Sequence, residues 1–323
     1  MSSVTSRAHS LRQRGVFGAN ASDRVFRWGL FVFAASVLAI IVVLGYELAH
    51  ASLPSMRHFG WRFLITSRWD PVHSIFGALP FIYGTLVSSF LALLIAVPIG
   101  LGAAVFLAEL SPRWLRGPVS FLVELLAAVP SIVYGLWGIF VLLPALRPVQ
   151  VWLGQHLGFL PLFQGPAYGI GMMAAGLILA IMVIPFITAV SREVLQAVPA
   201  SQREAAYALG ATRWEALRGP VFRYARAGIL GAIILGLGRA VGETMAVTMV
   251  IGNRPEISLS LFSLSSTLAS ALANNFLEAT HPLEISGLLE LALILFAITI
   301  VINAIARIML WSVSRGMAQG VRE

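Results

Sequence analysis

The chain has 323 residues, of which 58% are hydrophobic and 11% are charged, and its mean hydropathy is +0.87. Soluble globular proteins carry about twice that share of charged residues, so the composition indicates a membrane protein. The sequence has no cysteine and no lysine, and its formal charge of +8 comes from arginine, which excludes disulfides, thiolate metal sites and a nucleotide-binding loop of the GxxxxGK[ST] type.

Six apolar stretches are long enough to cross a membrane as helices, because about 20 residues span a hydrocarbon core of roughly 30 Å. They cover Phe26–Leu48, Phe76–Leu107, Val119–Leu143, Tyr168–Val190, Ala227–Ile251 and Leu283–Leu310. The alternating strands of a membrane β-barrel are absent from the pattern. We therefore predict an all-α membrane protein with six transmembrane helices, in which residues 1–24 form an amino-terminal tail and residues 25–323 form one membrane domain.

The arginines orient the predicted spans. With the amino terminus in the cytoplasm, 16 of the 22 arginines fall in internal segments. The external segments hold only Arg57, Arg62, Arg68, Arg147 and Arg254. This positive-inside bias predicts a multi-pass protein of the inner (plasma) membrane with both termini in the cytoplasm. It also explains the net charge by topology, so we expect the lipid bilayer and no nucleic acid as a partner.

The first three spans and their links contain several interpretable features. Ala51–Ile75 mixes tryptophan, arginine and proline and suits an external segment against the headgroups. Glu124, near the inner end of the third span, is expected to pair with a nearby arginine such as Arg116 or with another helix. Pro130 is expected to kink this span, because a proline inside a helix removes a backbone hydrogen bond. Arg147–Pro166, rich in proline and glycine, predicts an external segment.

The longest internal loop, Ser191–Arg226, contains two sequences typical of capped helix starts. Ser201-Gln-Arg-Glu204 and Thr212-Arg-Trp-Glu215 both have the form of a capping box, in which two side chains satisfy backbone amides reciprocally. Gly210 lies where the first helix would end with a positive φ. The loop therefore predicts two short cytoplasmic helices separated by a turn.

The fifth span carries two opposite charges near its middle, Arg239 and Glu243. Positions four apart share a helix face, so we expect the two side chains to pair across one turn. A charge at the bilayer centre costs about 2.5–3.5 kcal/mol, whereas such a pair returns only about 0.2–0.5 kcal/mol in water. We therefore expect a substrate path lined by Arg239, Glu243 and Thr244, with Arg239 as the fixed charge for an oxyanion. The GxxxG step at Gly238 and Gly242 agrees with a helix face turned to the bundle interior. The alternative is a packing helix with an internal ion pair that fixes its register.

The remaining segments carry weaker signals. Asn253–Pro282 predicts an external segment with a short surface helix, and Glu290 lies about two turns into the last span without a legible partner. The histidines lack metal-ligand spacing, and no serine, histidine and carboxylate set is present. We therefore expect no catalytic residues, no metal and no cofactor.

The internal loop resembles a known family motif. Glu204-Ala205-Ala206, followed after three residues by Gly210, is similar to the EAA loop of permease subunits in binding-protein-dependent ABC importers. That family usually closes the loop with Ile-x-Leu-Pro, whereas this chain has Pro220-Val-Phe-Arg223, so the end of the second helix is not assigned by the motif. The resemblance implies that this loop contacts a separate ATPase through Glu204, Ala205, Ala206, Gly210 and Arg213.

A second resemblance is more specific. GLGRAVGETMAVTMVIGN, Gly236–Asn253, closely resembles the fifth-helix signature of the PstC family, one of the two permease subunits of phosphate ABC importers. Phe76–Leu86 and Glu124–Pro144 also resemble that family, and Ser270–Phe276 does so more weakly. Its arginine and glutamate are regarded as path residues, which here correspond to Arg239 and Glu243.

The resemblance implies a type I ABC importer permease (MetI-like) fold and a set of partners. These are a PstA-type permease, two PstB-type ATPase subunits that hydrolyse ATP, a periplasmic phosphate-binding protein and phosphate itself. Ala51–Ile75 and Asn253–Pro282 are the segments expected to face the binding protein. Three alternatives remain: the permease of a sulfate or molybdate importer, an ion-coupled secondary transporter or channel, and a non-transporting scaffold.

Overall fold

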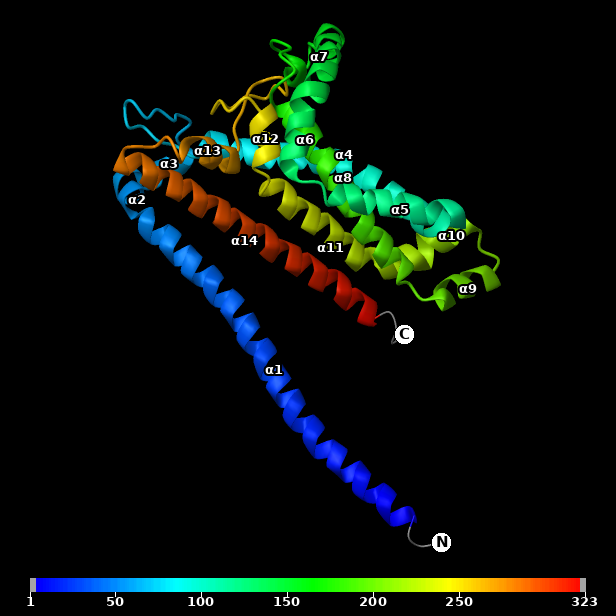
Figure 1. Ribbon diagram of the computed structural model, residues 1–323. Coiled ribbons are helices and arrows are strands. Elements are labelled where there is room, and N and C mark those ends of the chain that lie inside the picture. The colour runs from blue at the N-terminus through cyan, green and yellow to red at the C-terminus, as the bar shows by residue number, and fades with distance from the viewer. Residues whose placement is uncertain (1–3, 320–323) are drawn as a thin grey trace. The chain divides into compact units, whose positions relative to one another are not determined.

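The structure is a computed structural model that describes the backbone of residues 4–319 and the side chains of residues 23–312. The described chain is helical, with two isolated β-bridges, Asp70 to Ile75 and Gly252 to Ser265, as its only extended pairing (Figure 1). It divides into two compact units, Met1–Ala51 and Ser52–Glu323. The first unit is the single helix α1 (Val4–Ala51), whose apolar part, Asp23–Ala51, is long enough to cross a membrane.

Six helices of the described chain are long and apolar enough to be membrane spans, which confirms the predicted fold class. They are Asp23–Ala51, Leu79–Leu110, Ser131–Leu157, Met172–Gln196, Arg213–Val241 and Pro282–Ser312. Each of them overlaps a predicted stretch. The third and the fifth differ most from their predicted bounds, because each predicted span is broken and because the fifth also starts earlier, at Arg213.

The predicted third span, Val119–Leu143, is broken in the structure. Helix α5 (Arg113–Ala127) ends before Pro130, which precedes a new helix instead of kinking a continuous one. The new helix consists of α6 (Ser131–Trp137), a π-helical turn, η2 (Gly138–Leu142), and α7 (Leu143–Leu157). The extended ψ of 140° at Pro130 separates the two axes. The segment from Arg147 therefore begins as helix, because α7 continues to Leu157. Its external position stays a prediction.

The centre of the second unit is the packing of α4 (Leu79–Val105) against α8 (Met172–Gln196), which is more extensive than that of any other two described helices. Helix α8 is the most buried of the six candidate spans, because 61% of the residues in its most apolar 18-residue stretch are buried inside the protein. Gly100 of α4 permits the close approach, because a Cβ atom there would lie 3.1 Å from a methyl carbon of Ile187. Helix α11 (Phe222–Val241) packs against both members of this pair, and α14 (Pro282–Gln319) packs against α11 (Figure 1).

Short helices cover the end that the arginine distribution places outside. They are α2 (Leu53–Phe59), α3 (Arg62–Ile65), the 3-10 turn η3 (Pro161–Phe163), α12 (Met245–Val250) and α13 (Leu268–Asn275). Helix α13 confirms the short helix predicted within Asn253–Pro282. It begins with a capping box between Thr267 and Ser270, and the amide of Leu268 donates a 2.9 Å hydrogen bond to Thr85 of α4.

The opposite, inner end of the second unit is built around a cluster of buried apolar side chains, which we call the inner apolar cluster. It contains buried residues from the ends of α4 and α8 and from the internal loop, namely Ala104, Ala108, Leu195, Val198, Leu217, Val221, Ala225 and Ile229. Helix α4 continues there as a π-helical turn, η1 (Phe106–Leu110). The internal loop forms α9 (Ala200–Ala208), α10 (Arg213–Ala216) and a π-helical turn, η4 (Leu217–Val221), which leads into α11.

Candidate functional site

The first helix of the internal loop, α9, does not start as predicted. It begins at Ala200, and the residue at its N-cap position is Pro199, with no side chain capping the helix. Ser201 therefore lies inside the first turn, and the predicted capping box between Ser201 and Glu204 was wrong. The reason is that Pro199, with φ of −56°, needs no amide partner of its own and starts the helix earlier.

The second half of the loop matches the prediction. Gly210 has a φ of +83°. The amides of Gly210 and Ala211 donate to the carbonyls of Tyr207 and Ala206, at 2.9 and 3.1 Å. This pair of bonds is a Schellman motif, which closes the end of a helix. The chain then enters α10 through the confirmed capping box, in which Thr212 donates its amide to Glu215 at 2.7 Å and accepts from the Glu215 amide at 3.4 Å.

We call residues 200–216 the α9–α10 hairpin. The second helix continues through Pro220, because α10, η4 and α11 follow one another without a gap. Four of the predicted coupling residues, Glu204, Ala205, Gly210 and Arg213, are exposed, and Ala206 is half-buried. Two large apolar side chains beside them, Leu209 and Trp214, are 90% and 62% exposed. Exposed apolar side chains on a folded turn favour contact with a partner protein.

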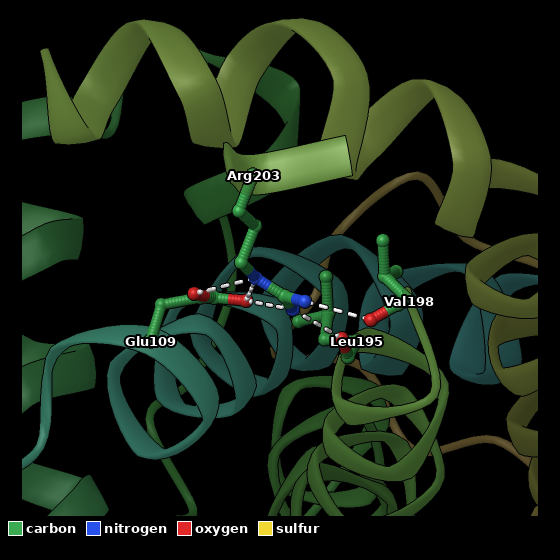
Figure 2. A network of polar contacts seen from close by, with 4 residues as sticks. All are labelled: Glu109, Leu195, Val198 and Arg203. Atoms are coloured by element: carbon green, nitrogen blue, oxygen red, sulfur yellow. Dashed lines mark hydrogen bonds and ion pairs between the residues drawn. The ribbon is translucent and has the colours of Figure 1, made fainter. Parts of the chain in front are cut away.

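Arg203 of α9 was not singled out from the sequence, yet it makes the densest polar contacts of the hairpin (Figure 2). Its Nε and Nη2 atoms donate to the Glu109 carboxylate, the shortest contact being 2.6 Å. Nη1 donates to the Val198 carbonyl at 2.7 Å and Nη2 to the Leu195 carbonyl at 2.9 Å. No local pattern signals this site, because Glu109 precedes Arg203 by 94 residues.

A groove of about 700 Å³ lies between the hairpin and the inner end of α4. Its lining combines the ion pair of Glu109 and Arg203 with aromatic and apolar side chains: Leu110, Tyr207, Ala211, Arg213, Trp214, Ala216, Leu217 and Val221. The hairpin is therefore not packed tightly against η1 on this side. Its position depends on a few specific contacts instead.

The predicted ion pair in the fifth span does not form. Helix α11 ends at Val241, Gly242 is its C-cap, and Arg239 and Glu243 make no salt bridge in the described chain. The Glu243 carboxylate instead accepts a 3.2 Å hydrogen bond from the amide of Ala246, at the start of α12. The prediction assumed an unbroken helix, and the break at Gly242 turns Glu243 off the helix face that carries Arg239.

Arg239 consequently has no carboxylate partner among the described residues. Its guanidinium carbon lies 5.9 Å from the ring centroid of Phe186 on α8, and its buried Nε makes no hydrogen bond. A half-buried guanidinium with free donors and an aromatic neighbour is suited to an incoming anion. Gly238 has no neighbour within 4 Å of an added Cβ, so the GxxxG step does not act as a packing face there.

The broken span is packed against the other broken span. A Cβ atom on Gly135 of α6 would lie 2.4 Å from the sulfur of Met249 on α12, so the two short helices are in close contact. Thr244, the third predicted path residue, is half-buried at the N-cap of α12, and its hydroxyl donates to the Gly242 carbonyl at 3.3 Å. Interrupted helices inside a membrane are tolerated where they face protein or a polar cavity.

The two other glutamates considered in the sequence have different surroundings. Glu124 pairs with Arg192 of α8, the Nη2–Oε1 distance being 2.8 Å, and not with Arg116. Glu290 of α14 is only 6% exposed, and one of its carboxylate oxygens has no hydrogen-bond partner. It lines an apolar groove of about 690 Å³ between α14 and α2.

The sequence matches a family model described as binding-protein-dependent transport system inner membrane component, over residues 96–318. It is 48% identical to the phosphate transport system permease protein PstC of Pasteurella multocida, over 91% of this chain and 93% of that protein. It is 47% identical to the protein of that name from Mesorhizobium japonicum, over 90% of each chain.

Two solved structures share the fold at low sequence identity. A bacterial ABC transporter involved in the import of the acidic polysaccharide alginate matches 87% of this chain and 96% of its own, with a TM-score of 0.57 and 14% identity. A chain of the MetNI methionine ABC transporter, in an inward-facing conformation, matches 76% of this chain and 99% of its own, with a TM-score of 0.56 and 19% identity. These likenesses concern the fold alone.

Proposed function

Because this chain belongs to the family of binding-protein-dependent transport system inner membrane components, with the MetI-like fold of type I ABC importer permeases, we propose that it is the PstC-type permease subunit of an ATP-driven phosphate importer. Relatives named phosphate transport system permease protein PstC match 90% or more of its length at 44–48% identity. The six apolar helices place such a subunit in the inner membrane.

The observation that carries the proposal for the path is the unpaired guanidinium of Arg239. A charged group in a membrane span is costly and is retained where it faces a path or a partner. Among the described residues no carboxylate neutralises Arg239, and its Nε has no acceptor. A phosphate ion would supply oxygens for the planar fork of donors, which suits a tetrahedral oxyanion better than an ammonium does.

Glu243 and Thr244 are assigned to the same path in different roles. The Glu243 carboxylate accepts a hydrogen bond from the Ala246 amide at the start of α12 and so contributes to the break that separates it from Arg239. A carboxylate also accepts a hydrogen bond from a protonated phosphate oxygen, whereas sulfate has no proton to donate at neutral pH. This chemistry favours phosphate over the sulfate or molybdate alternatives. The Thr244 hydroxyl adds a neutral donor and acceptor beside the break.

The α9–α10 hairpin is proposed as the surface that contacts the ATPase. It is exposed, it is ordered by a Schellman motif and a capping box, and it carries the exposed Leu209 and Trp214. The chain has no lysine and hence no GxxxxGK[ST] loop, so ATP is hydrolysed on a partner. The proposed assembly is this subunit with a PstA-type permease, two PstB-type ATPases and a periplasmic phosphate-binding protein.

The test is uptake of labelled phosphate by vesicles that hold the reconstituted complex, with ATP inside and the binding protein outside. The proposal predicts uptake that requires ATP and continues in the presence of excess sulfate. Loss of the labelled signal to sulfate would mean a permease for another oxyanion. Uptake without ATP would contradict an ATP-driven importer and favour a secondary transporter.

A further inference from the structure

Helix α9 lacks the apolar anchors that hold the long helices of this protein in place. None of its residues is buried. On one side it borders the groove of about 700 Å³ that separates the hairpin from η1. Helices in proteins are positioned mainly by packing an apolar face. Helix α9 packs only through partly buried residues against α10 and η4, so its polar contacts carry more weight in setting its place.

Arg203 makes these polar contacts. Its three nitrogen atoms all donate, to one carboxylate and two carbonyl oxygens, at distances from 2.6 to 3.3 Å. The side chains of Arg203 and Glu109 are 21% and 19% exposed, so water screens the pair less than it would a surface ion pair. A lysine has a single nitrogen and cannot reproduce this planar fork, although it keeps the charge.

The acceptors of Arg203 lie on the two central helices of the bundle. Glu109 belongs to η1, the continuation of α4, and Leu195 lies in the last turn of α8, with Val198 just beyond it (Figure 2). Both carbonyls are at the end of α8, where the partial negative charge of the helix terminus attracts a cation. Leu195 and Val198 also belong to the inner apolar cluster, so this side of the contact is rigid.

We propose that Arg203 is the positioning residue that joins α9 to the inner ends of α4 and α8, so that a displacement of the hairpin by a partner moves these two helices. The inference rests on the proposed function, because an importer driven by a separate ATPase needs such a mechanical connection. The Schellman motif and the capping box make the hairpin stiff enough to move as a unit. Arg203 is the point at which that unit is attached to the membrane helices.

The test compares the complete complex with Arg203→Ala, Arg203→Lys and Glu109→Gln variants in vesicles, measuring both ATP hydrolysis and phosphate uptake. We expect Arg203→Ala to lower the amount of phosphate imported per ATP at least about tenfold, since several charge-assisted hydrogen bonds are lost. The ATPase should still co-purify and still hydrolyse ATP. Arg203→Lys should show the same uncoupling to a smaller extent. Adding Glu109→Gln to Arg203→Ala should not lower the ratio further, because the two residues act together.

The matched control is Arg223→Lys, a charge-preserving change at an exposed arginine near the start of α11. It should leave the ratio of phosphate to ATP unchanged. If Arg203→Ala also leaves the ratio unchanged, the proposal is overturned. It is equally overturned if Arg203→Ala and Arg203→Lys abolish assembly, ATP hydrolysis and uptake together, because Arg203 would then be needed for folding instead of coupling.

A second measurement separates this inference from the proposed function. The chain has no cysteine, so Ser201→Cys on the exposed side of α9 can carry a single nitroxide label. We expect the label to become more mobile in the assembled complex when Arg203→Lys is added, and not when Arg223→Lys is added. Equal mobility in both would contradict the positioning role even if phosphate uptake is confirmed. Absence of phosphate uptake by the unmodified complex would contradict the proposed function, while the label would still test Arg203.

Discussion

Gly210 offers a sharp test of whether the shape of the α9–α10 hairpin matters for coupling. Its φ of +83° lies in the left-handed region, where a Cβ atom costs roughly 1–2 kcal/mol. A Cβ atom added at Gly210 would meet no atom within 4 Å, so Gly210→Ala introduces backbone strain without a clash. A cost of this size changes the ratio of ordered to disordered turns by a factor of about 5 to 30.

The assay is the stimulation of ATP hydrolysis by the phosphate-loaded binding protein, measured on the reconstituted complex. We expect Gly210→Ala to reduce this stimulation severalfold and Gly210→Asn to reduce it less, because asparagine tolerates the left-handed region better than alanine does. Gly219→Ala is the matched control, since Gly219 lies in the same loop, also has no neighbour within 4 Å and does not have a positive φ. Equal behaviour of Gly210→Ala and Gly219→Ala would refute the reasoning.

Three further predictions concern stability. Thr212→Ala removes the capping box and should destabilise the hairpin by about 1 kcal/mol, seen as faster hydrogen exchange of the α10 amides. Glu124→Ala should lower the thermal midpoint of the purified protein more than Arg192→Ala does, because the side chain of Arg192 is 11% exposed and would lose its partner, whereas that of Glu124 is 53% exposed; equal shifts would contradict this. The hydrogen bond from His73 lowers the pKa of Asp70 from 3.8 to about 2, so the stabilisation from Asp70 is complete above pH 4 and is lost as the pH falls towards 2. Asp70→Asn should therefore reduce the acid-dependent decrease in thermal midpoint over that interval, and an unchanged decrease would exclude Asp70 as a contributor.

The sequence was sufficient for the number of membrane helices and for much of the cytoplasmic turn. An apolar run of about 18 or more residues is rarely compatible with a soluble fold. The positive φ of Gly210 and the box at Thr212 depend only on neighbouring residues. The capping box predicted at Ser201 does not form, because Pro199 competes for the helix start and α9 begins at Ala200. A capping box therefore predicts a helix start reliably where no other helix-start signal lies beside it.

The breaks inside the spans were less predictable. A hydropathy pattern does not separate α5 from α6, so the sequence favours a kink at Pro130 within one helix. The spacing of Gly238 and Gly242 favours a packing face on a continuous helix. The expected ion pair of Arg239 with Glu243 also requires a continuous helix, whereas α11 ends at Val241. Whether a glycine ends a membrane helix depends on the packing of its neighbours, which is information that the local sequence does not contain.

Contacts between distant segments were out of reach. In the sequence Arg203 is one more internal arginine, because its acceptors on η1 and α8 come together only when α4 and α8 pack. The sequence likewise does not decide whether Glu124 pairs with a neighbour or with another helix, and tertiary packing selects Arg192. These examples show why charged residues at helix ends are hard to assign without a fold.

The most direct test of the central claim is the initial rate of labelled phosphate uptake by vesicles containing the complex with Arg239→Gln, beside Arg239→Lys and the unmodified subunit. We expect Arg239→Gln to lower the rate on the order of 100-fold or more, because two charge-assisted hydrogen bonds to the anion are lost. Assembly with the ATPase should be retained, and Arg239→Lys should keep part of the uptake. Uptake by Arg239→Gln at the rate of the unmodified complex would contradict a role of Arg239 in the phosphate path and leave it as a packing residue.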